Sequence, residues 1–181
     1  MKIVILDRDG VINHESDAYI KSPAEFKPIK DSLEAIVRLN FAGYLVTVAT
    51  NQSGIARGLF DNYTLQSIHR KMADLLFGLG GKIDAVFYCP HANVDNCDCR
   101  KPKSGMLKSI LSGFNIAAKD AIVIGDSLRD LQAGIAAGVK SPILVETGKG
   151  AKTLQDPKLP KNTPVFTNLA AAVENILKTA K

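Results

Sequence analysis

Short apolar runs alternate along the chain with longer amphipathic stretches. The apolar runs predict strands at residues 2–6, 44–49, 85–88, 121–124, 142–145 and 164–166. The periodic stretches between and after them predict helices at residues 31–41, 64–79, 104–113, 128–137 and 169–177. Continuous apolar strands separated by helices indicate a parallel sheet that is covered on both faces. We therefore expect a doubly wound, Rossmann-like α/β fold.

Local signals at the helix ends agree with this pattern. Asp31-Ser32 and the segment 62–64 are suitable helix starts, and Gly43 and Gly138 follow helical stretches as C-terminal stops. The chain has 181 residues and lacks internal repeats and low-complexity tracts, so we expect a single domain over residues 1–181.

The composition says more about the cellular location of the protein than about its function. No apolar run approaches the roughly 20 residues that cross a bilayer, and we expect neither a signal peptide nor a membrane anchor. All three cysteines lie in one short segment, which argues against a disulfide framework and favours a cytoplasmic protein. The formal charge of +5 is mostly dispersed along the chain and fits either nucleic acid or a small anionic substrate.

Polar loops follow three of the predicted strands. The loops are Asp7-Arg8-Asp9-Gly10, the segment 50–54 and the segment 125–130. Any one of them can be read as ordinary loop-forming sequence. Because parallel strands end at one edge of the sheet, where such folds bind their ligands, three such loops together favour a functional site.

The residue types in these loops suit phosphoryl transfer. Asp7, the backbone carbonyl of Asp9, and Asp126 offer oxygen ligands for Mg²⁺. Asp7 is then placed to attack phosphorus and form an aspartyl-phosphate. Asp9 would protonate the leaving oxygen and later activate water. Donors to the phosphoryl group would be Thr50, Asn51 and Lys101.

Asp7 and Asp9 have two other possible roles. A response-regulator receiver also phosphorylates an aspartate on a doubly wound sheet, but there the acceptor follows a later strand. Both aspartates could instead be structural, although clustered carboxylates at a sheet edge still require a cation. The convergent loops favour catalysis.

The cysteine segment predicts a second metal site. Four potential ligands, three thiolates and one imidazole, form a standard zinc set within eleven residues: Cys89, His91, Cys97 and Cys99. Four protein ligands leave no position for a reactive water, so this zinc would be structural. The alternative is incidental reduced thiols beside a surface histidine. A bound zinc would position the next residues, Arg100 and Lys101, and Arg100 suits a second phosphate or remains a solvated arginine.

The motifs together resemble the haloacid dehalogenase superfamily. The resemblance rests on Asp7-x-Asp9-Gly10, Thr50-Asn51, Lys101-Pro102 and Gly125-Asp126-Ser127-x-x-Asp130, in that order and at those strand ends. It implies the superfamily fold, with Asp7 as nucleophile, Asp9 as acid and base, and Asp126 on magnesium. Thr50 and Lys101 would hold the phosphoryl group, and Asp130 would orient Lys101 or its neighbours. The spacing between motifs leaves no room for a separate cap domain.

Longer segments resemble one family within this superfamily. Residues 7–13, residues 50–58 and the Cys-Pro-His…Cys-x-Cys-Arg-Lys-Pro run are similar to the heptose-bisphosphate and histidinol-phosphate phosphatases. The resemblance implies removal of the 7-phosphate of D-glycero-D-manno-heptose 1,7-bisphosphate in the cytoplasm, on the route to ADP-heptose for lipopolysaccharide. Substrate contacts would fall on Glu15, Tyr19, Gln52, Ser53 and Arg100. The first loop is about one residue longer than the family pattern, and Ser127 replaces a lysine found in some members.

Three alternatives stay open from the sequence. Histidinol phosphate is one alternative substrate. A polynucleotide end-phosphatase would also use an uncapped, basic site, but no strip of aromatic and basic residues for stacking bases accompanies the motifs. A phosphate or metal sensor would keep the fold without needing Asp9. We expect a monomer that acts on a small sugar phosphate and binds neither nucleic acid nor membrane.

Overall fold

The computed structural model describes residues 2–179 and contains every strand and helix that the sequence predicts. The strands are β1 Ile3–Leu6, β2 Leu45–Asn51, β3 Ala85–Cys89, β4 Ala121–Gly125, β5 Ile143–Val145 and β6 Val165–Phe166. The helices are α1 Ser32–Phe41, α2 Asn62–Gly78, α3 Gly105–Gly113, α4 Leu128–Ala136, α5 Gly150–Thr153 and α6 Leu169–Thr179. Three single 3-10 turns lie at Pro23–Glu25, Asn93–Asp95 and Ala118–Asp120.

The six strands form one parallel sheet in the order β3-β2-β1-β4-β5-β6. The chain winds outward from β1 in one direction through β2 and β3, and then in the other through β4, β5 and β6. The strand order therefore reverses between β1 and β4. In open α/β sheets this switch point, at the carboxyl ends of the strands, is where ligands bind.

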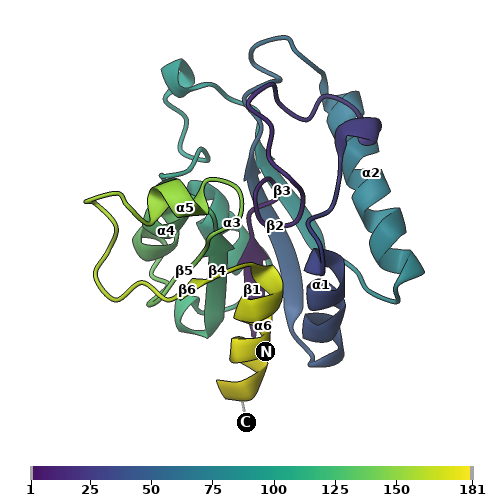
Figure 1. The fold of residues 1–181 in the computed structure, drawn as a ribbon. Coiled ribbons are helices and arrows are strands. Elements are labelled where there is room, and N and C mark those ends of the chain that lie inside the picture. Colours follow the sequence, from purple (N-terminus) through teal and green to yellow (C-terminus); the bar gives the residue numbers. More distant parts are fainter. Residues whose placement is uncertain (1, 180–181) are drawn as a thin grey trace.

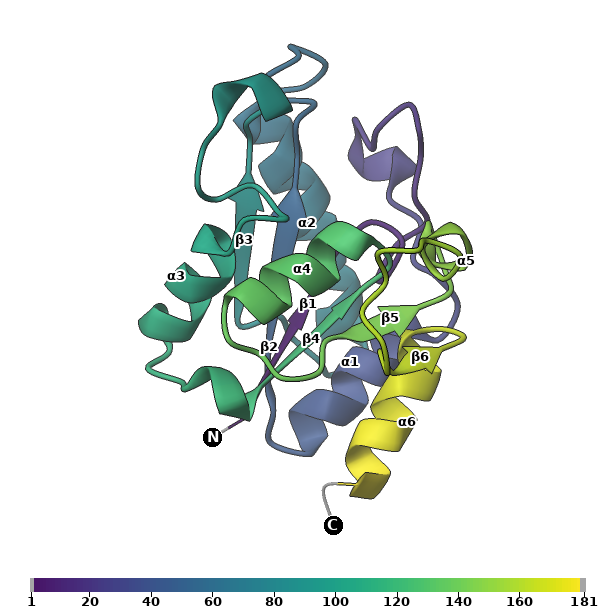
Figure 2. The ribbon, with the colours of Figure 1, turned by 90° about the vertical axis from the view of Figure 1, so that its left-hand side faces the viewer.

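Helices cover both faces of the sheet, as Figures 1 and 2 show. α1, α2 and α6 pack on one face, and α3 and α4 pack on the other. Successive residues of β1 point to opposite faces, so that Val4 and Leu6 enter the core under α1, while Ile3 and Ile5 enter the core under α3. This explains why the strand is apolar at every position and is buried throughout.

The predicted helix ends are close to those observed. Gly43 and Gly138 lie just beyond α1 and α4 with φ of 80° and 93°, which confirms them as C-terminal stops. The start of α2 differs slightly, because its capping residue is Asp61, one position before the predicted segment. The Asp61 carboxylate accepts a 2.8 Å hydrogen bond from the backbone N–H of Thr64.

Loops, rather than a further domain, surround the carboxyl edge of the sheet within residues 2–179. These are the segments after β1, after β2, after β3 and after β5. Helix α5 lies in the last of them and was not predicted, because a single turn shows no apolar periodicity. None of the helices formed by the described residues is both long and apolar enough to span a membrane.

Candidate active site

Lys101 lies at the centre of the site. It comes from the loop between β3 and α3, and its side chain is only 4% exposed. The ammonium lies 3.1 Å from Asp7 Oδ1 and 2.6 Å from Asp130 Oδ1, and it donates a 2.6 Å hydrogen bond to the carbonyl of Ala49. Burial disfavours the charge, but Asp130 and Asp7 outweigh it and raise the pKa of Lys101 to about 12. The lysine is therefore a fixed cation beside Asp7.

Asn51 supports this lysine through the backbone. Its side-chain N–H donates to the carbonyl of Lys101 at 3.0 Å, and its side-chain oxygen accepts from the backbone N–H of Lys101 at 3.1 Å. Asn51 is thus in the predicted place, but both ends of its amide contact Lys101. Asp130 accepts from the N–H and hydroxyl of Ser127, at 3.1 and 2.6 Å, which fixes its carboxylate against the lysine.

Asp7 and Asp130, which contact Lys101, form a cluster of three carboxylates with Asp126. One oxygen from each of Asp7, Asp126 and Asp130 lies within 4.8 Å of the others. Burial raises the pKa of Asp7 to about 7, despite the opposing effect of Lys101, and the charges of Asp130 and Asp9 add to the rise. Burial, followed by the charges of Asp7 and Asp130, raises the pKa of Asp126 to about 8. The cluster therefore has too little positive charge nearby to keep Asp7 and Asp126 both ionised at neutral pH.

Glycine backbone forms one wall of the carboxylate cluster. Gly10 has φ of 83° and Gly148 has φ of 60°, and a side chain on either would overlap Oδ2 of Asp126. The same oxygen accepts a 2.8 Å hydrogen bond from the backbone N–H of Lys149. The hydroxyl of Thr147 donates to the carbonyl of Gly10 at 2.6 Å, which ties the loop after β5 to the loop after β1.

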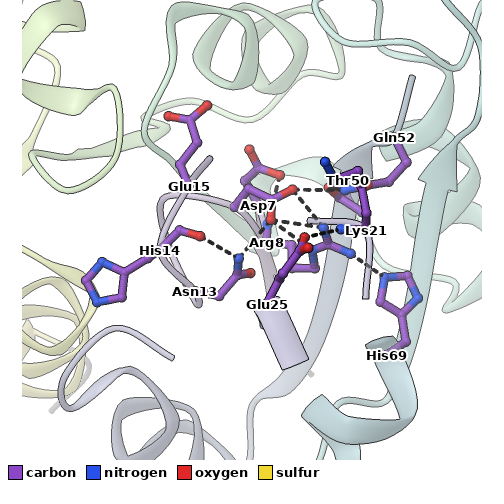
Figure 3. Close-up of polar contacts among 12 residues, drawn as sticks. Asp7, Arg8, Asn13, His14, Glu15, Lys21, Glu25, Thr50, Gln52 and His69 are labelled. Atoms are coloured by element: carbon purple, nitrogen blue, oxygen red, sulfur yellow. Dashed lines mark hydrogen bonds and ion pairs between the residues drawn. The ribbon is translucent and has the colours of Figure 1, made fainter. Parts of the chain in front are cut away.

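Asp9 is held by its own neighbour in the motif. Arg8 Nε and Nη2 donate to the Asp9 carboxylate at 2.9–3.1 Å, and Asn13 donates to Oδ1 at 2.9 Å (Figure 3). Burial would raise the pKa of Asp9, but the Arg8 guanidinium and the amide donors of Asn13 and Gln52 hold it below its ordinary value. Arg8 is fully buried. It was not predicted, because the middle residue of Asp-x-Asp carries no signal of its own contacts.

Gln52 links Asp9 to Thr50. Its amide N–H₂ donates to Asp9 Oδ2 and to Thr50 Oγ1, both at 2.9 Å. The predicted substrate residue Gln52 therefore lies at the site, with its amide donors directed at two protein groups. Thr50 and Ser53 are almost fully buried and line the same cavity.

These side chains line one cavity of about 320 Å³ at the carboxyl edge. It contains every predicted catalytic and substrate residue: Asp7, Asp9, Glu15, Tyr19, Thr50, Asn51, Gln52, Ser53, Arg100 and Lys101, together with Asp126. Glu15 lines the cavity from the loop after β1 and forms an ion pair with Lys149. The structure thus brings the predicted set together.

Three of the cationic residues that line the cavity were not predicted as site residues from the sequence. Arg57, Arg129 and Lys149 line the cavity beside Arg100. Arg129 lies within the polar loop at 125–130, and Arg57 lies within the stretch 50–58 that resembles the family, which was the available signal. Neither of these two arginines forms an ion pair within the part of the chain that the structure describes, residues 2–179. The mouth is therefore suited to an anionic group.

The cysteine segment forms a compact cluster. Cys99 Sγ lies 3.4 Å from His91 Nδ1, and the other neighbouring ligand atoms are 3.5–3.6 Å apart. The sulfur–sulfur distances exceed the roughly 2.05 Å of a disulfide. Tetrahedral zinc ligands at about 2.0–2.3 Å from the metal would lie roughly 3.6–3.8 Å apart. The observed spacing therefore fits a tetrahedral metal.

Arg100 leaves this cluster with its side chain already fixed. Its Nε donates to Asn93 Oδ1 at 2.6 Å, and its Nη1 donates to the carbonyl of His91 at 3.1 Å. The Cys/His loop thereby fixes the Arg100 side chain where it lines the cavity.

Comparisons with known proteins agree with this site. A family model described as HAD-hydrolase-like matches residues 98–172. The D-glycero-beta-D-manno-heptose-1,7-bisphosphate 7-phosphatase of Bordetella bronchiseptica is 51% identical over 180 residues, which is 99% of this chain and 100% of that protein. The protein of the same name from Pseudomonas putida is 47% identical and covers 98% of this chain and 100% of its own length.

A solved structure matches equally well. The crystal structure of D,D-heptose 1,7-bisphosphate phosphatase from B. bronchiseptica, complexed with magnesium and phosphate, has a TM-score of 0.96 at 50% identity. The match covers 99% of each chain. The chain therefore belongs to the D-glycero-beta-D-manno-heptose-1,7-bisphosphate 7-phosphatase family of haloacid dehalogenase phosphatases.

Proposed function

We propose that this enzyme removes the 7-phosphate of D-glycero-beta-D-manno-heptose 1,7-bisphosphate through an aspartyl-phosphate on Asp7. The observation that carries the mechanism is the buried Lys101 ammonium, 3.1 Å from Asp7 beside a cluster of three carboxylates. The names of the relatives at 47% and 51% identity support the sugar and its beta form. This reaction would be a step in the synthesis of ADP-heptose for lipopolysaccharide.

Magnesium fits the carboxylate cluster. Asp7 and Asp126, whose raised pKa values reflect burial without enough positive charge, would hold the ion together with the backbone carbonyl of Asp9. The magnesium of the Bordetella structure supports this assignment. When bound, the ion neutralises phosphate oxygens and makes phosphorus more electrophilic.

In the first step the Asp7 carboxylate attacks phosphorus. An O–P bond forms to Asp7 while the bond from phosphorus to the sugar oxygen breaks, and Asp9 gives its proton to that oxygen. Lys101 and Thr50 donate to the phosphoryl oxygens as their charge rises. The resting pKa of Asp9 is low, so its proton would arrive with the phosphate monoester, whose second pKa is about 6.

In the second step Asp9 acts as a base. It accepts a proton from a water whose oxygen attacks the phosphorus of the aspartyl-phosphate. The bond between phosphorus and Asp7 breaks, releasing inorganic phosphate and restoring the Asp7 carboxylate. The lowered pKa of Asp9 keeps it ionised for this role.

The cavity mouth would recognise the rest of the substrate. Arg100, with Arg57 and Arg129 nearby, is suited to the phosphate that is not removed, because a guanidinium binds oxyanions through two N–H groups. Glu15, Tyr19 and Ser53 would contact sugar hydroxyls. Asn51 and Gln52 would act by holding Lys101, Asp9 and Thr50, to which their amides are bonded.

Zinc is our proposal for the Cys/His cluster. Three sulfurs and one nitrogen at tetrahedral spacing suit Zn²⁺, and four protein ligands give it a structural role. The ion would anchor the loop that carries Arg100 and Lys101. A zinc content near zero per chain, measured by mass spectrometry of protein purified without chelators, would contradict this assignment.

The proposal also covers the cellular location and the oligomeric state of the protein. Three thiols gathered at one candidate metal site favour a reducing cytoplasm. We further propose a single domain over residues 1–181 that works as a monomer. A sugar-phosphate cavity at one sheet edge requires no nucleic acid or membrane partner.

The decisive experiment compares substrates. We expect kcat/KM for the beta heptose bisphosphate to exceed kcat/KM for the alpha form and for histidinol phosphate. Faster turnover of histidinol phosphate, or salt-sensitive turnover of oligonucleotide end phosphates, would replace the proposed substrate. Failure to hydrolyse any phosphate ester with magnesium would favour a sensor.

A further inference from the structure

Arg8 connects the phosphoryl-transfer site to helix α2. Its Nε and Nη2 hold Asp9, and its other terminal nitrogen, Nη1, lies 3.2 Å from Nε2 of His69 (Figure 3). His69 comes from the middle of α2, 61 residues away in the sequence. The two ends of one buried guanidinium thus contact the proposed acid and base on one side and a histidine outside the cavity lining on the other.

The chemistry of this contact fixes the state of the histidine. An arginine has only N–H donors and keeps its charge in proteins, so His69 Nε2 must be the acceptor. The ring is then neutral and carries its proton on Nδ1. Burial, followed by the charge of Arg8, lowers the pKa of His69 to about 4 against the opposing effect of Asp9, which agrees with a neutral ring.

A neutral histidine is well matched to this position. The planar guanidinium is bonded along one edge to Asp9 and at its far end to His69, so rotation would break hydrogen bonds on both sides. Without His69 the buried Nη1 group would lose its acceptor, which is costly for a charged donor. The ring in turn lies 6.3 Å from the ring of Tyr88, whose hydroxyl contacts Asn62 at 3.2 Å.

We propose that His69 is a positioning residue that acts through Arg8 to aim the Asp9 carboxylate at the leaving-group oxygen. The proposal rests on the proposed function, since Asp9 must be the acid. It assigns to α2 a contribution to the reaction without any contact to substrate. Misplacement of a reacting group by about 1 Å costs up to roughly 100-fold in rate, so the effect is measurable.

The test uses three variants and two substrates. His69→Met removes the acceptor and keeps an apolar side chain, whereas His69→Gln restores an acceptor oxygen near the position of Nε2. Arg70→Met is the matched control, because Arg70 is the next residue of α2 and pairs with Asp74 on the surface. Each is assayed for kcat/KM on the heptose bisphosphate, whose alcohol needs a proton to leave, and on p-nitrophenyl phosphate, whose phenolate leaves without one.

The expected result is selective. His69→Met should lower kcat/KM for the heptose bisphosphate by about 10- to 100-fold and for p-nitrophenyl phosphate by less than about threefold. His69→Gln should recover most of the loss, and Arg70→Met should match the wild type. Melting temperatures establish that each variant is folded under the assay conditions.

Other outcomes overturn the inference. Equal losses on both substrates would show that His69 only stabilises the fold, and wild-type kcat/KM in His69→Met would show that Arg8 holds Asp9 unaided. Equal losses in the Met and Gln variants would exclude the acceptor as the cause. A wild-type enzyme inactive on both substrates would instead refute the proposed function, so the two failures are distinguishable.

Discussion

Replacing Asp126 with asparagine should stabilise the magnesium-free protein while removing its activity. Asp126 is 3% exposed, and burial next to Asp7 and Asp130 raises its pKa from 3.8 to about 8. Because the pKa of Asp126 is higher in the folded than in the unfolded state, its carboxyl makes its full contribution to stability below pH 3.8, where it is protonated in both states. This contribution is lost as the pH rises from 3.8 toward 8, because the unfolded state releases its proton first. Asparagine carries no charge to lose over that range.

The magnitude follows from the shift. At pH 7 the wild type is about three pH units above the unfolded pKa, and each unit is worth about 1.36 kcal/mol, which gives an upper value of about 4 kcal/mol. Because Asp7 shares the repulsion, we expect about 2–4 kcal/mol. For a domain of this size that corresponds to roughly 4–16 °C in Tm.

The assay is thermal unfolding followed by circular dichroism between pH 5 and 9. Magnesium is removed by gel filtration without a strong chelator, so that the zinc proposed at the Cys/His cluster would be retained. The variant should melt above the wild type at pH 7 and above, and added Mg²⁺ should raise Tm for the wild type alone. A variant whose Tm falls with pH in parallel with the wild type would refute the account of the cluster.

Three further changes test other parts of the site. Asp130→Asn should cost about 3 kcal/mol in urea unfolding, because it breaks a buried ion pair with Lys101; a cost below about 1 kcal/mol would contradict this. Gly10→Ala should lower kcat by at least about 10-fold, since its side chain would overlap Asp126 at positive φ; normal kinetics would disprove the close approach. Cys97→Ser should abolish zinc binding at the proposed Cys/His site, as measured by mass spectrometry, and raise KM as Arg100 loosens; full zinc occupancy would count against the ligand set.

Most strands and helices were readable from the sequence because the strands are largely apolar and are bounded by polar turns. β1, buried on both faces, is the clearest case. The single turn α5 was not predicted, because four residues are too few to show an apolar periodicity. The predicted cap of α2 is one residue too late, because Asp61 and Asn62 are both good N-capping residues.

The site was predictable where it depends on strand ends. Asp7 and Asp126 directly follow β1 and β4, and Thr50 lies near the carboxyl end of the neighbouring strand β2, so their convergence is a consequence of the sheet. Contacts between residues that are far apart in the sequence could not be predicted in this way. Arg8 pairs with a histidine 61 residues away, and Asn51 bonds to a backbone 50 residues away, so neither partner could be read from local sequence.

The covalent role of Asp7 is tested most directly by trapping the intermediate. The enzyme is mixed with heptose bisphosphate and Mg²⁺, quenched in acid within one turnover, digested and analysed by mass spectrometry. We predict a phosphoryl group on Asp7 in the wild type, and none in a folded Asp7→Asn variant whose kcat has fallen by more than about 1,000-fold. Appreciable turnover by that variant, or a phosphoryl group on another residue, would contradict the account.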